Sequence, residues 1–422
     1  RAIKVKPDYT EAYNNMGVAL QAKGELDAAI DSYKKVLKTK PDYAEAYNNM
    51  GVTQRDRGDL DAAIDNCKQA INIKPNYAEA YNNMGNSLKD KGELDAAIDS
   101  YEQAIKIKPD YAEAHFNKSV ALLLSKEFNI GWSEYEWRWE AIKYEASFKY
   151  ISTSKPIWQF DREQRVLLWH EQGIGDEVMF ASLIPDLHSL CSKLIVGIDK
   201  RLIPLFRRSF PDNIDFRSGD EAVPETEYDA HIPMGSLPQH FRQTIDSFKS
   251  TSKGWLFACD VKASSLRKKL LSDGSETLVG ISWHSTKPRS GAENKLITLT
   301  QLAKSLQAPK VKLINLQYGD VSTELDSLRK EIGIEVIQVP EIDNKYDIDD
   351  LAALIMACDK VVSISNVTIH LAGALGKEAQ VLLASSGDWR WGTSCNSSHW
   401  YDSVELHRQT KMDDWDNVLK QL

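Results

Sequence analysis

The chain has 422 residues, of which 42% are hydrophobic and 27% are charged. This composition is typical of a globular protein and excludes a disordered or collagen-like one, and the length favours two or three domains. The 61 acidic residues outnumber the 52 basic ones and give a formal net charge of -9, which argues against a general nucleic-acid binder. No apolar run approaches the roughly 18 residues of a membrane span and no signal-peptide pattern is present, so we expect a cytoplasmic protein without a membrane span.

The first third of the chain is repetitive. Prolines recur at one constant interval, at Pro7, Pro41, Pro75 and Pro109. This interval matches the tetratricopeptide repeat (TPR), whose period is about 34 residues and whose units each form two helices. Apolar residues at helical spacing, such as Tyr13, Met16 and Leu20, predict amphipathic helices that pack against neighbouring units. We therefore expect residues 1–140 to form an α-solenoid with a concave groove.

The fourth unit begins regularly and then departs from the pattern. Residues 128–140 read FNIGWSEYEWRWE, and all 11 tryptophans of the chain lie at or after Trp132. A degenerate last unit is typical of a capping repeat, which here is expected to pack against something outside the array. A different kind of domain is expected from about residue 141.

One polar residue type recurs within the repeats. Asparagines at the same interval as the prolines occupy one repeat position, at Asn15, Asn49, Asn83 and Asn117. A primary amide both donates and accepts hydrogen bonds, so a ladder of amides on the groove suits the backbone of an extended peptide. The alternative is that asparagine is an ordinary structural residue at this position. Binding of a protein or peptide partner is expected in either case.

The rest of the chain alternates short apolar runs with helix-length segments. Strands are predicted at 166–169, 194–198, 214–216 and 229–232, and again at 278–283, 311–316, 335–339, 360–364 and 379–383. This pattern predicts two parallel α/β domains, residues 141–245 and 246–422, each resembling a Rossmann fold. Ligands of such sheets bind outside the carboxyl ends of the strands.

Several segments carry a resemblance to a known family. HEQGIGDEVMFASLIPDL at 170–187, VGISW at 279–283, INLQYGD at 314–320 and SNVTIHLAGALGK at 365–377 resemble bacterial heptosyltransferase-like glycosyltransferases of the GT-B fold. The whole layout resembles bacterial proteins that place TPR repeats and an EYEWRW junction ahead of such a module. The resemblance implies a GT-B fold of two Rossmann-like domains facing a cleft, with an acceptor side at 141–245 and a nucleotide-sugar donor side at 246–422.

The resemblance also implies a reaction: inverting sugar transfer from a nucleotide-sugar, without a metal or other cofactor. Inversion needs a base that takes the acceptor proton. The position of Asp176 in the GD motif makes it the first candidate, with Glu171 and His170 as alternatives. Another interpretation is that Asp176 caps a helix starting near Glu177.

The donor site is expected where a strand leads into a helix at Val367, because free amides at a helix N-terminus bind phosphate. Gly173 and Gly175 are expected to let the backbone approach the ligand. The remaining donor-binding candidates are Trp283, His284, Thr286, Lys287, Gln317, Tyr318, Ser365, Asn366, Val367, Thr368 and His370.

Two features bear on these expectations. Ser365 and Asn366 stand where related enzymes often carry an Asp-Thr pair, which leaves the donor sugar open. Asp347 and Asp349 have the spacing of a metal-binding DxD, but they open a predicted helix, where acidic residues complement the helix dipole. We interpret them as capping residues.

Two functions remain open. The first is a glycosyltransferase whose repeats recruit a polypeptide acceptor, as in O-linked and flagellin-modifying enzymes that couple the same modules, or that takes a glycan or lipid-linked acceptor. The alternative is a TPR scaffold or adaptor with a degenerate, non-catalytic glycosyltransferase-like domain.

Overall fold

The computed structural model describes residues 10–141, 150–248, 254–271, 277–285, 297–385, 387–393, 395–411 and 414–422. These residues form two compact units. The first contains residues 10–141 together with 387–393, and the second contains the other described residues.

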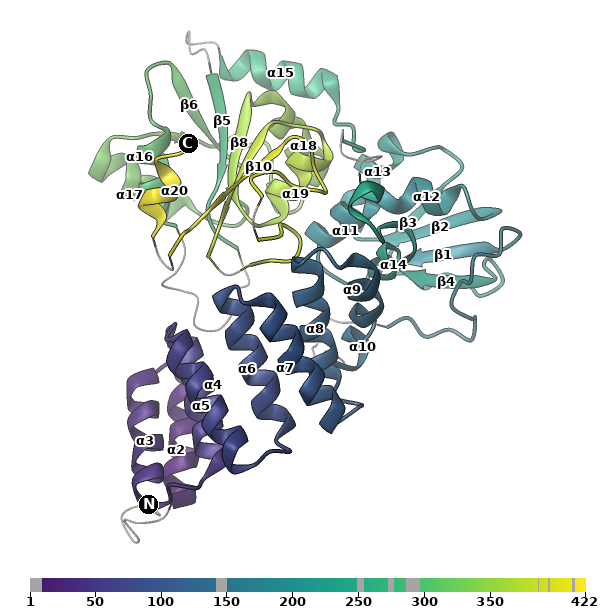
Figure 1. The fold of residues 1–422 in the computed structure, drawn as a ribbon. Helices are drawn as coiled ribbons and strands as arrows, with labels where there is room; N and C mark the ends of the chain where they lie inside the picture. The colour runs from purple at the N-terminus through teal and green to yellow at the C-terminus, as the bar shows by residue number, and fades with distance from the viewer. Residues whose placement is uncertain are drawn as a thin grey trace. The chain divides into compact units, whose positions relative to one another are not determined.

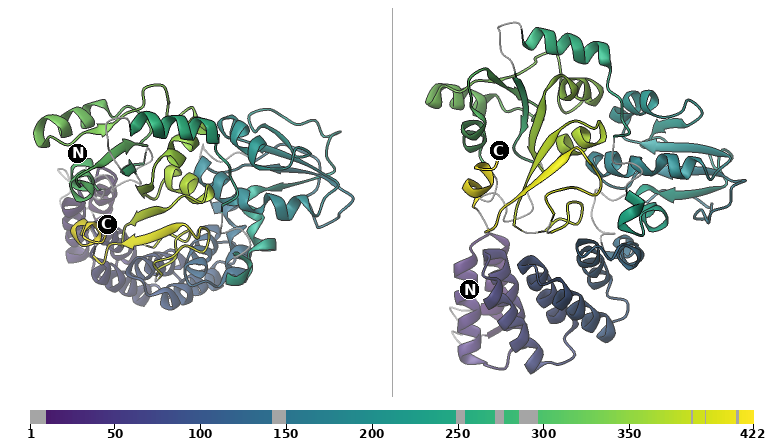
Figure 2. Two further views of the ribbon diagram at one scale, coloured as in Figure 1. Left: turned by 90° about the horizontal axis from the view of Figure 1, so that it is seen from above. Right: turned by 45° about the horizontal axis from the view of Figure 1, so that its top comes forward.

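The first unit is a series of helical hairpins (Figures 1 and 2). Its helices are α2 (Thr10–Ala22), α3 (Leu26–Thr39), α4 (Ala44–Arg57), α5 (Leu60–Ile73), α6 (Ala78–Lys91), α7 (Leu94–Ile107), α8 (Ala112–Leu124), α9 (Phe128–Tyr135) and α10 (Arg138–Ala141). The first helices of successive hairpins (α2, α4, α6 and α8) contact one another, whereas their second helices lie further apart. The first helices therefore lie on the inner side of the curve seen at left in Figure 2, and we call them the inner helices. The predicted helical solenoid is confirmed.

Close helix approach explains the repeated small residues. A methyl group added at Gly17 would lie 2.5 Å from the ring of Tyr33, and one at Gly85 would lie 2.6 Å from that of Tyr101. Both tyrosines have no exposed surface. Only glycine therefore lets the second helix of the hairpin bury its tyrosine against the first.

A segment from near the end of the chain belongs to the repeat unit. Trp389, in residues 387–393, packs edge-on against Trp132 with ring centroids 5.4 Å apart, and its ring centroid lies 5.7 Å from that of Tyr135. Trp389 and Trp132 are 6% and 1% exposed. The aromatic residues of the degenerate fourth repeat thus form a core with this segment.

The second unit contains two sheets, and every strand pair in them is parallel. The first has the order β3-β2-β1-β4 and consists of β1 (Arg165–Trp169), β2 (Lys193–Ile198), β3 (Asp215–Ser218) and β4 (Ala230–Pro233). Its helices are α11 (Ile174–Phe180), α12 (Ile184–His188), α13 (Ile203–Ser209) and α14 (Pro238–Phe241), with 3-10 turns at Ala181–Leu183, Lys200–Leu202, Met234–Ser236 and Ile245–Phe248.

The second sheet has the order β10-β9-β8-β5-β6-β7. It consists of β5 (Thr277–Ser282), β6 (Val311–Asn315), β7 (Val336–Ile337), β8 (Lys360–Ile364), β9 (Ala379–Leu383) and β10 (Val404–Arg408). Its helices are α15 (Asp260–Leu270), α16 (Leu299–Leu306), α17 (Ser322–Ile332), α18 (Ile348–Ala357), α19 (Val367–Ala374) and α20 (Trp415–Leu419). The α/β prediction is confirmed, and the edge strand β10 is an addition to it.

Two local expectations can be compared with these elements. Asp347 is the N-cap of α18, where its side chain accepts a hydrogen bond from the amide of Asp350, so it caps the helix as its position indicated. Asp349 lies in the first turn of α18 and pairs with Arg208 instead. The helix that was expected to start near Glu177 instead begins at Ile174, and a 3-10 turn at Ala181–Leu183 separates α11 from α12. Among the described residues, no helix combines the length and apolar character needed to cross a bilayer.

The glycine-tyrosine packing predicts a specific loss of stability. Gly85→Ala should lower the free energy of unfolding of the array by about 1–3 kcal/mol, because the new methyl group overlaps the buried ring of Tyr101. Gly51→Ala is the matched comparison, because the nearest atoms there are Ala63 O and Cys67 Sγ, each at 3.0 Å. Urea unfolding followed by helical circular dichroism measures both. Equal losses in the two variants would contradict the role given to the tyrosine.

Candidate functional site

The strand orders define where ligands of the second unit are expected. In each sheet, successive strands are first added on one side of a central strand, and the next strand is then added on its other side. The direction of strand order therefore reverses between β1 and β4 in the first sheet and between β5 and β8 in the second. Crevices at such reversals, beside the carboxyl ends of the strands, are the usual ligand sites of open α/β sheets. The predicted catalytic and donor-binding residues that the structure describes follow β1, β5, β6 and β8, which are the strands at or next to these reversals.

Asn366 fills the reversal point of the second sheet. It is the N-cap of α19, and its Oδ1 accepts hydrogen bonds from the amide of Thr368 at 3.0 Å and from Oγ of Ser363 at 3.1 Å. Its Nδ2 donates to Oγ of Ser282 at 2.7 Å and to the carbonyl of His284 at 3.3 Å. The side chain therefore joins β8, β5 and α19, and in this arrangement it has no donor left for a phosphate.

The side chain of Gln317 forms hydrogen bonds with the loop that follows β5. Its Oε1 accepts hydrogen bonds from Oγ of Ser282 and from the backbone amides of Trp283 and His284, at 2.9–3.0 Å. Its Nε2 donates to the carbonyl of His284 at 3.1 Å, and the side chain is 1% exposed. Gln317 thus supports the loop rather than presenting its amide to a nucleotide.

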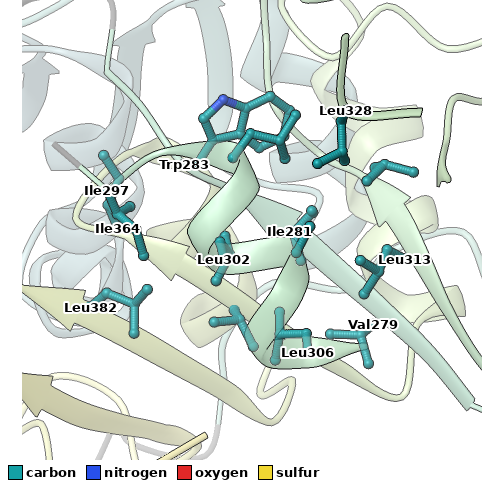
Figure 3. Packing of buried hydrophobic residues seen from close by; sticks show 14 of the residues in the cluster. Val279, Ile281, Trp283, Ile297, Leu302, Leu306, Leu313, Leu328, Ile364 and Leu382 are labelled. Carbon is teal, nitrogen blue, oxygen red and sulfur yellow. The ribbon is translucent and has the colours of Figure 1, made fainter. Parts of the chain in front are cut away.

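Trp283 is a core residue. It is 2% exposed and lies with Ile281, Leu302 and Leu328 in the apolar cluster of Figure 3. Its indole Nε1 donates to Oε2 of Glu324 at 2.7 Å. The expectation that this ring meets the donor is therefore replaced by a packing role.

The first turns of α11 and α19 lie against each other. A methyl group at Gly175 would lie 3.1 Å from Cδ2 of His370, so the absence of a side chain there makes room for this imidazole. His370 is 4% exposed, and its Nδ1 is hydrogen-bonded to the hydroxyl of Tyr401 at 2.8 Å. Gly175 and His370 thus come together as a contact between the helices that follow β1 and β8.

Backbone donors remain open near this contact. The amides of Ile174 and Gly175 in α11, and that of Val367 in α19, have no hydrogen-bond partner among the described residues. Gly173 is exposed, and a methyl group there would have no atom within 4 Å. Open amides at helix starts attract anions because the dipole is positive there.

The candidate bases are in different surroundings. Asp176 lies in the first turn of α11 and is partly exposed; it is not the N-cap, which is Gly173. Glu171 is 5% exposed, and its Oε2 accepts a hydrogen bond from the amide of Gly235 across the first reversal point. Asp176 is therefore the more accessible carboxylate.

His170, the third candidate, is held by Glu177. Its Nδ1 donates to Oε1 of Glu177 at 3.1 Å, while Oε2 of this 3%-exposed carboxylate accepts from the amide of Asp199 at 2.8 Å. Burial by itself lowers the pKa of His170, but the hydrogen bond to Glu177 and the negative charges of Glu177 and Asp199 outweigh it, and the pKa is raised.

The remaining candidates are less informative. Ser365 and Tyr318 are partly exposed at the carboxyl edge of the second sheet. Thr368 is fully buried, and its hydroxyl donates to the carbonyl of Leu316 at 3.5 Å. Thr286 and Lys287 lie outside the described residues.

The asparagine ladder has a second row. Nδ2 of Asn49, Asn83 and Asn117 donates to Oδ1 of Asn14, Asn48 and Asn82 on the preceding inner helix, at 3.2, 2.9 and 3.0 Å respectively. Asn15 is exposed at the same repeat position. The remaining amide atoms, which are Nδ2 of the accepting asparagines and Oδ1 of the donating asparagines, have no partner among the described residues. Each pair thus presents one free donor and one free acceptor.

The sequence interpretation missed three kinds of residue. Asn48 and Asn82 were detectable, because they repeat with the same period as their neighbours. Glu177 was visible only as a helix-start residue, since its bond to Asp199 depends on the pairing of β1 with β2. Tyr401 meets His370 from a segment 31 residues further along the chain, which no local pattern indicates.

Comparisons with known proteins support the repeats directly. The TPR repeat family matches residues 19–55, 53–91 and 85–124. Protein FlbA of Caulobacter vibrioides is 29% identical over 317 residues, which cover 72% of this chain and 53% of FlbA. The chain therefore spans about half the length of that relative. Since residues 1–141 are about a third of the chain, the match extends into the α/β region.

Solved structures are similar to part of this chain. MamA shares 28% identity over 35% of this chain and 86% of its own, with a TM-score of 0.31. The first TPR of Spaghetti (RPAP3), solved with the HSP90 peptide SRMEEVD, shares 22% identity over 26% of this chain and 86% of its own, with a TM-score of 0.25. Residues 19–124 of the chain are TPR repeats.

The Glu177 contact predicts a pH dependence. The raised pKa of His170 means that the pair stabilises the fold fully below the ordinary histidine pKa of 6.5, and that this contribution is lost as pH rises through the raised value. Glu177→Gln should lower the pKa of His170, as measured by NMR titration. His231, whose pKa burial lowers, is the internal control. An unchanged His170 titration in Glu177→Gln would refute the assignment.

Proposed function

We propose that the protein binds an extended polypeptide along its inner helices and acts as an adaptor. The observation that carries this proposal is the free donor and free acceptor on each asparagine pair. A peptide backbone offers one N–H and one C=O per residue, which is the complement of this arrangement, and recognition through the main chain is independent of side-chain sequence.

Burial adds to the argument. Asn48 and Asn82 are 6% and 5% exposed, yet their unpaired Nδ2 groups are not among the polar atoms cut off from solvent. A buried side chain loses little rotamer freedom when a ligand binds, because its amide is already fixed by the neighbouring repeat. The ladder is therefore preorganised for a ligand that crosses several repeats.

Removing the amides tests this function. The variant Asn49→Ala/Asn83→Ala/Asn117→Ala should bind a neutral unstructured peptide at least tenfold more weakly, because each lost hydrogen bond is worth about 0.5–1.5 kcal/mol. Fluorescence anisotropy with a labelled glutamine-serine decapeptide measures this, and circular dichroism checks that the array stays folded.

The control removes three amides from the second helices. Gln69, Asn72 and Gln103 are exposed on α5 and α7, so Gln69→Ala/Asn72→Ala/Gln103→Ala should bind the decapeptide like the wild type. Equal binding by all three proteins would show that the ladder is structural only.

A second candidate function is sugar transfer in the α/β unit, for which we propose a nucleotide-sugar donor and Asp176 as the acceptor-side base. The observation that favours it is the convergence of α11 and α19, with open amides at Ile174, Gly175 and Val367, beside two strand-order reversals. Such a cradle suits a diphosphate without a metal. The adaptor proposal does not require this activity.

A blocking variant tests the donor site. Gly173 has space around it and extended backbone angles that any residue adopts, so Gly173→Leu should fold normally while its side chain obstructs the open amides. In a thermal-shift panel of UDP, GDP, ADP, dTDP, CMP and their sugars, one nucleotide should raise the unfolding temperature of the wild type. That shift should disappear in Gly173→Leu.

The control places the same side chain at the opposite edge of the first sheet. Asp212 is exposed just before the amino end of β3, so Asp212→Leu should retain the nucleotide shift. Absence of any shift in the wild type would reject nucleotide binding and leave the adaptor function alone.

A further inference from the structure

One segment of the chain packs in the first unit although its neighbours in the sequence belong to the second. Residues 387–393 lie in the first unit, whereas β9 before them and β10 after them are paired strands of the second sheet. The chain therefore passes between the two units on both sides of this segment, as well as after α10. We call residues 387–393 the inserted segment.

Trp389 packs the inserted segment into the last hairpin of the array. Its side chain is 6% exposed, and its ring lies against those of Trp132 and Tyr135 in α9, with centroids 5.4 and 5.7 Å away. A methyl group at Gly387 would lie 3.0 Å from Cδ2 of Leu124, so the backbone of the segment also lies close to the end of α8. Removal of Trp389 would therefore leave a cavity in the aromatic core of the hairpin.

The inserted segment is itself a closed turn. The amide of Trp391 donates to the carbonyl of Asp388 at 2.9 Å, and Asp388 and Gly392 form an antiparallel bridge. Gly392 has a φ of 67°, in the left-handed region that favours glycine. The guanidinium carbon of Arg390 lies 4.4 Å from the centroid of the Trp389 ring. Because the turn is already ordered, little conformational entropy is lost when Trp389 packs against α9.

The chain that follows the inserted segment is packed in the second unit. Trp400 is 1% exposed, and its ring lies edge-on to that of Phe180 in α11, with centroids 6.0 Å apart. Tyr401 has no exposed surface, stacks on Trp255 with centroids 5.4 Å apart, and is hydrogen-bonded to His370 of α19. With the second unit folded, the chain is thus fixed by β9 before the segment and by these rings after it.

The packing of Trp389 depends on the folding of both units. With the second unit unfolded, Trp132 and Trp389 are joined by a long flexible chain, and closing such a loop costs conformational entropy. A folded second unit replaces most of that chain by an ordered body, so less entropy is lost when Trp389 packs. A free-energy coupling of this kind is reciprocal. Folding of either unit therefore favours folding of the other.

We propose that the inserted segment couples the two units through Trp389, so that the array and the α/β unit unfold together and a change in the stability of one is transmitted to the other. This inference requires neither the adaptor function nor sugar transfer. It does have a consequence for both, because a ligand that binds only the native form of one unit then stabilises the other as well.

Two buried cysteines report the unfolding of each unit separately. Cys67 lies in α5 of the array, Cys358 follows α18 in the second unit, and neither has any exposed surface. Burial raises the pKa of each thiol to about 12, so both should react with iodoacetamide only when their surroundings open. Pulses of iodoacetamide on the full chain at increasing urea, followed by peptide mass spectrometry, give one unfolding midpoint for each thiol.

The two midpoints should coincide in the wild type. Ile281→Val, in the core of the second sheet, should lower both by roughly 0.3–1 M urea, although it removes a methylene group from one unit only. In a Trp389→Ala background, Ile281→Val should lower the midpoint of Cys358 and leave that of Cys67 unchanged. If Trp389→Ala makes both thiols reactive without urea, Trp389→Leu replaces it, and the shift transmitted to Cys67 should be smaller than in the wild type.

The matched control changes a tryptophan of equal burial in the second unit. Trp415 is also 6% exposed and lies in the core of the second sheet, so Trp415→Leu should lower both midpoints together. Separate midpoints in the wild type, or an unchanged Cys67 midpoint in Ile281→Val, would overturn the coupling. Undiminished transmission to Cys67 in the Trp389 variant would overturn the role given to the inserted segment.

Discussion

The hydrogen bond between asparagines of consecutive inner helices is the polar contact that recurs from one repeat to the next. In a solenoid each repeat contacts only its neighbours, so one contact must recur at every step. Here Nδ2 of one asparagine and Oδ1 of another, 35 residues apart, form that contact three times. Gly17 and Gly85 support this contact, because they leave room for the buried tyrosine that packs the two helices of the hairpin together.

In the α/β unit, the amide side chains at the second reversal point hydrogen-bond within the unit, whereas the asparagine pairs of the repeats keep part of each amide without a partner among the described residues. At its second reversal point Asn366 and Gln317 direct their amides to Ser282, His284 and the first turn of α19. The bonds to Ser282 and Thr368 are buried, so removing either partner there leaves a donor or acceptor without water, which is costly. These side chains are thus occupied within the unit, whereas the backbone amides of Ile174, Gly175 and Val367 have no hydrogen-bond partner among the described residues.

The fold was largely predictable, because repeat period and strand-helix alternation are local properties. The repeat period and nearly all of the strands followed from the sequence, whereas β10 did not, since its residues follow a tryptophan-rich loop without a helix between. For the candidate site, the sequence predicted which segments contribute residues but not which way each side chain points. Trp283 and Gln317 were expected to face a ligand because they end strands, but whether such a residue points outward or into the core is decided by α17 and by the loop after β5. These contacts are distant in the sequence.

In the adaptor that we propose, each asparagine of a pair serves both the structure of the array and the binding of the ligand. One half of each asparagine amide joins two repeats and the other half is open, so any substitution there changes both the array and its ligand surface. In this adaptor, the amides that would bind the backbone of the partner are thus also the amides that join the repeats.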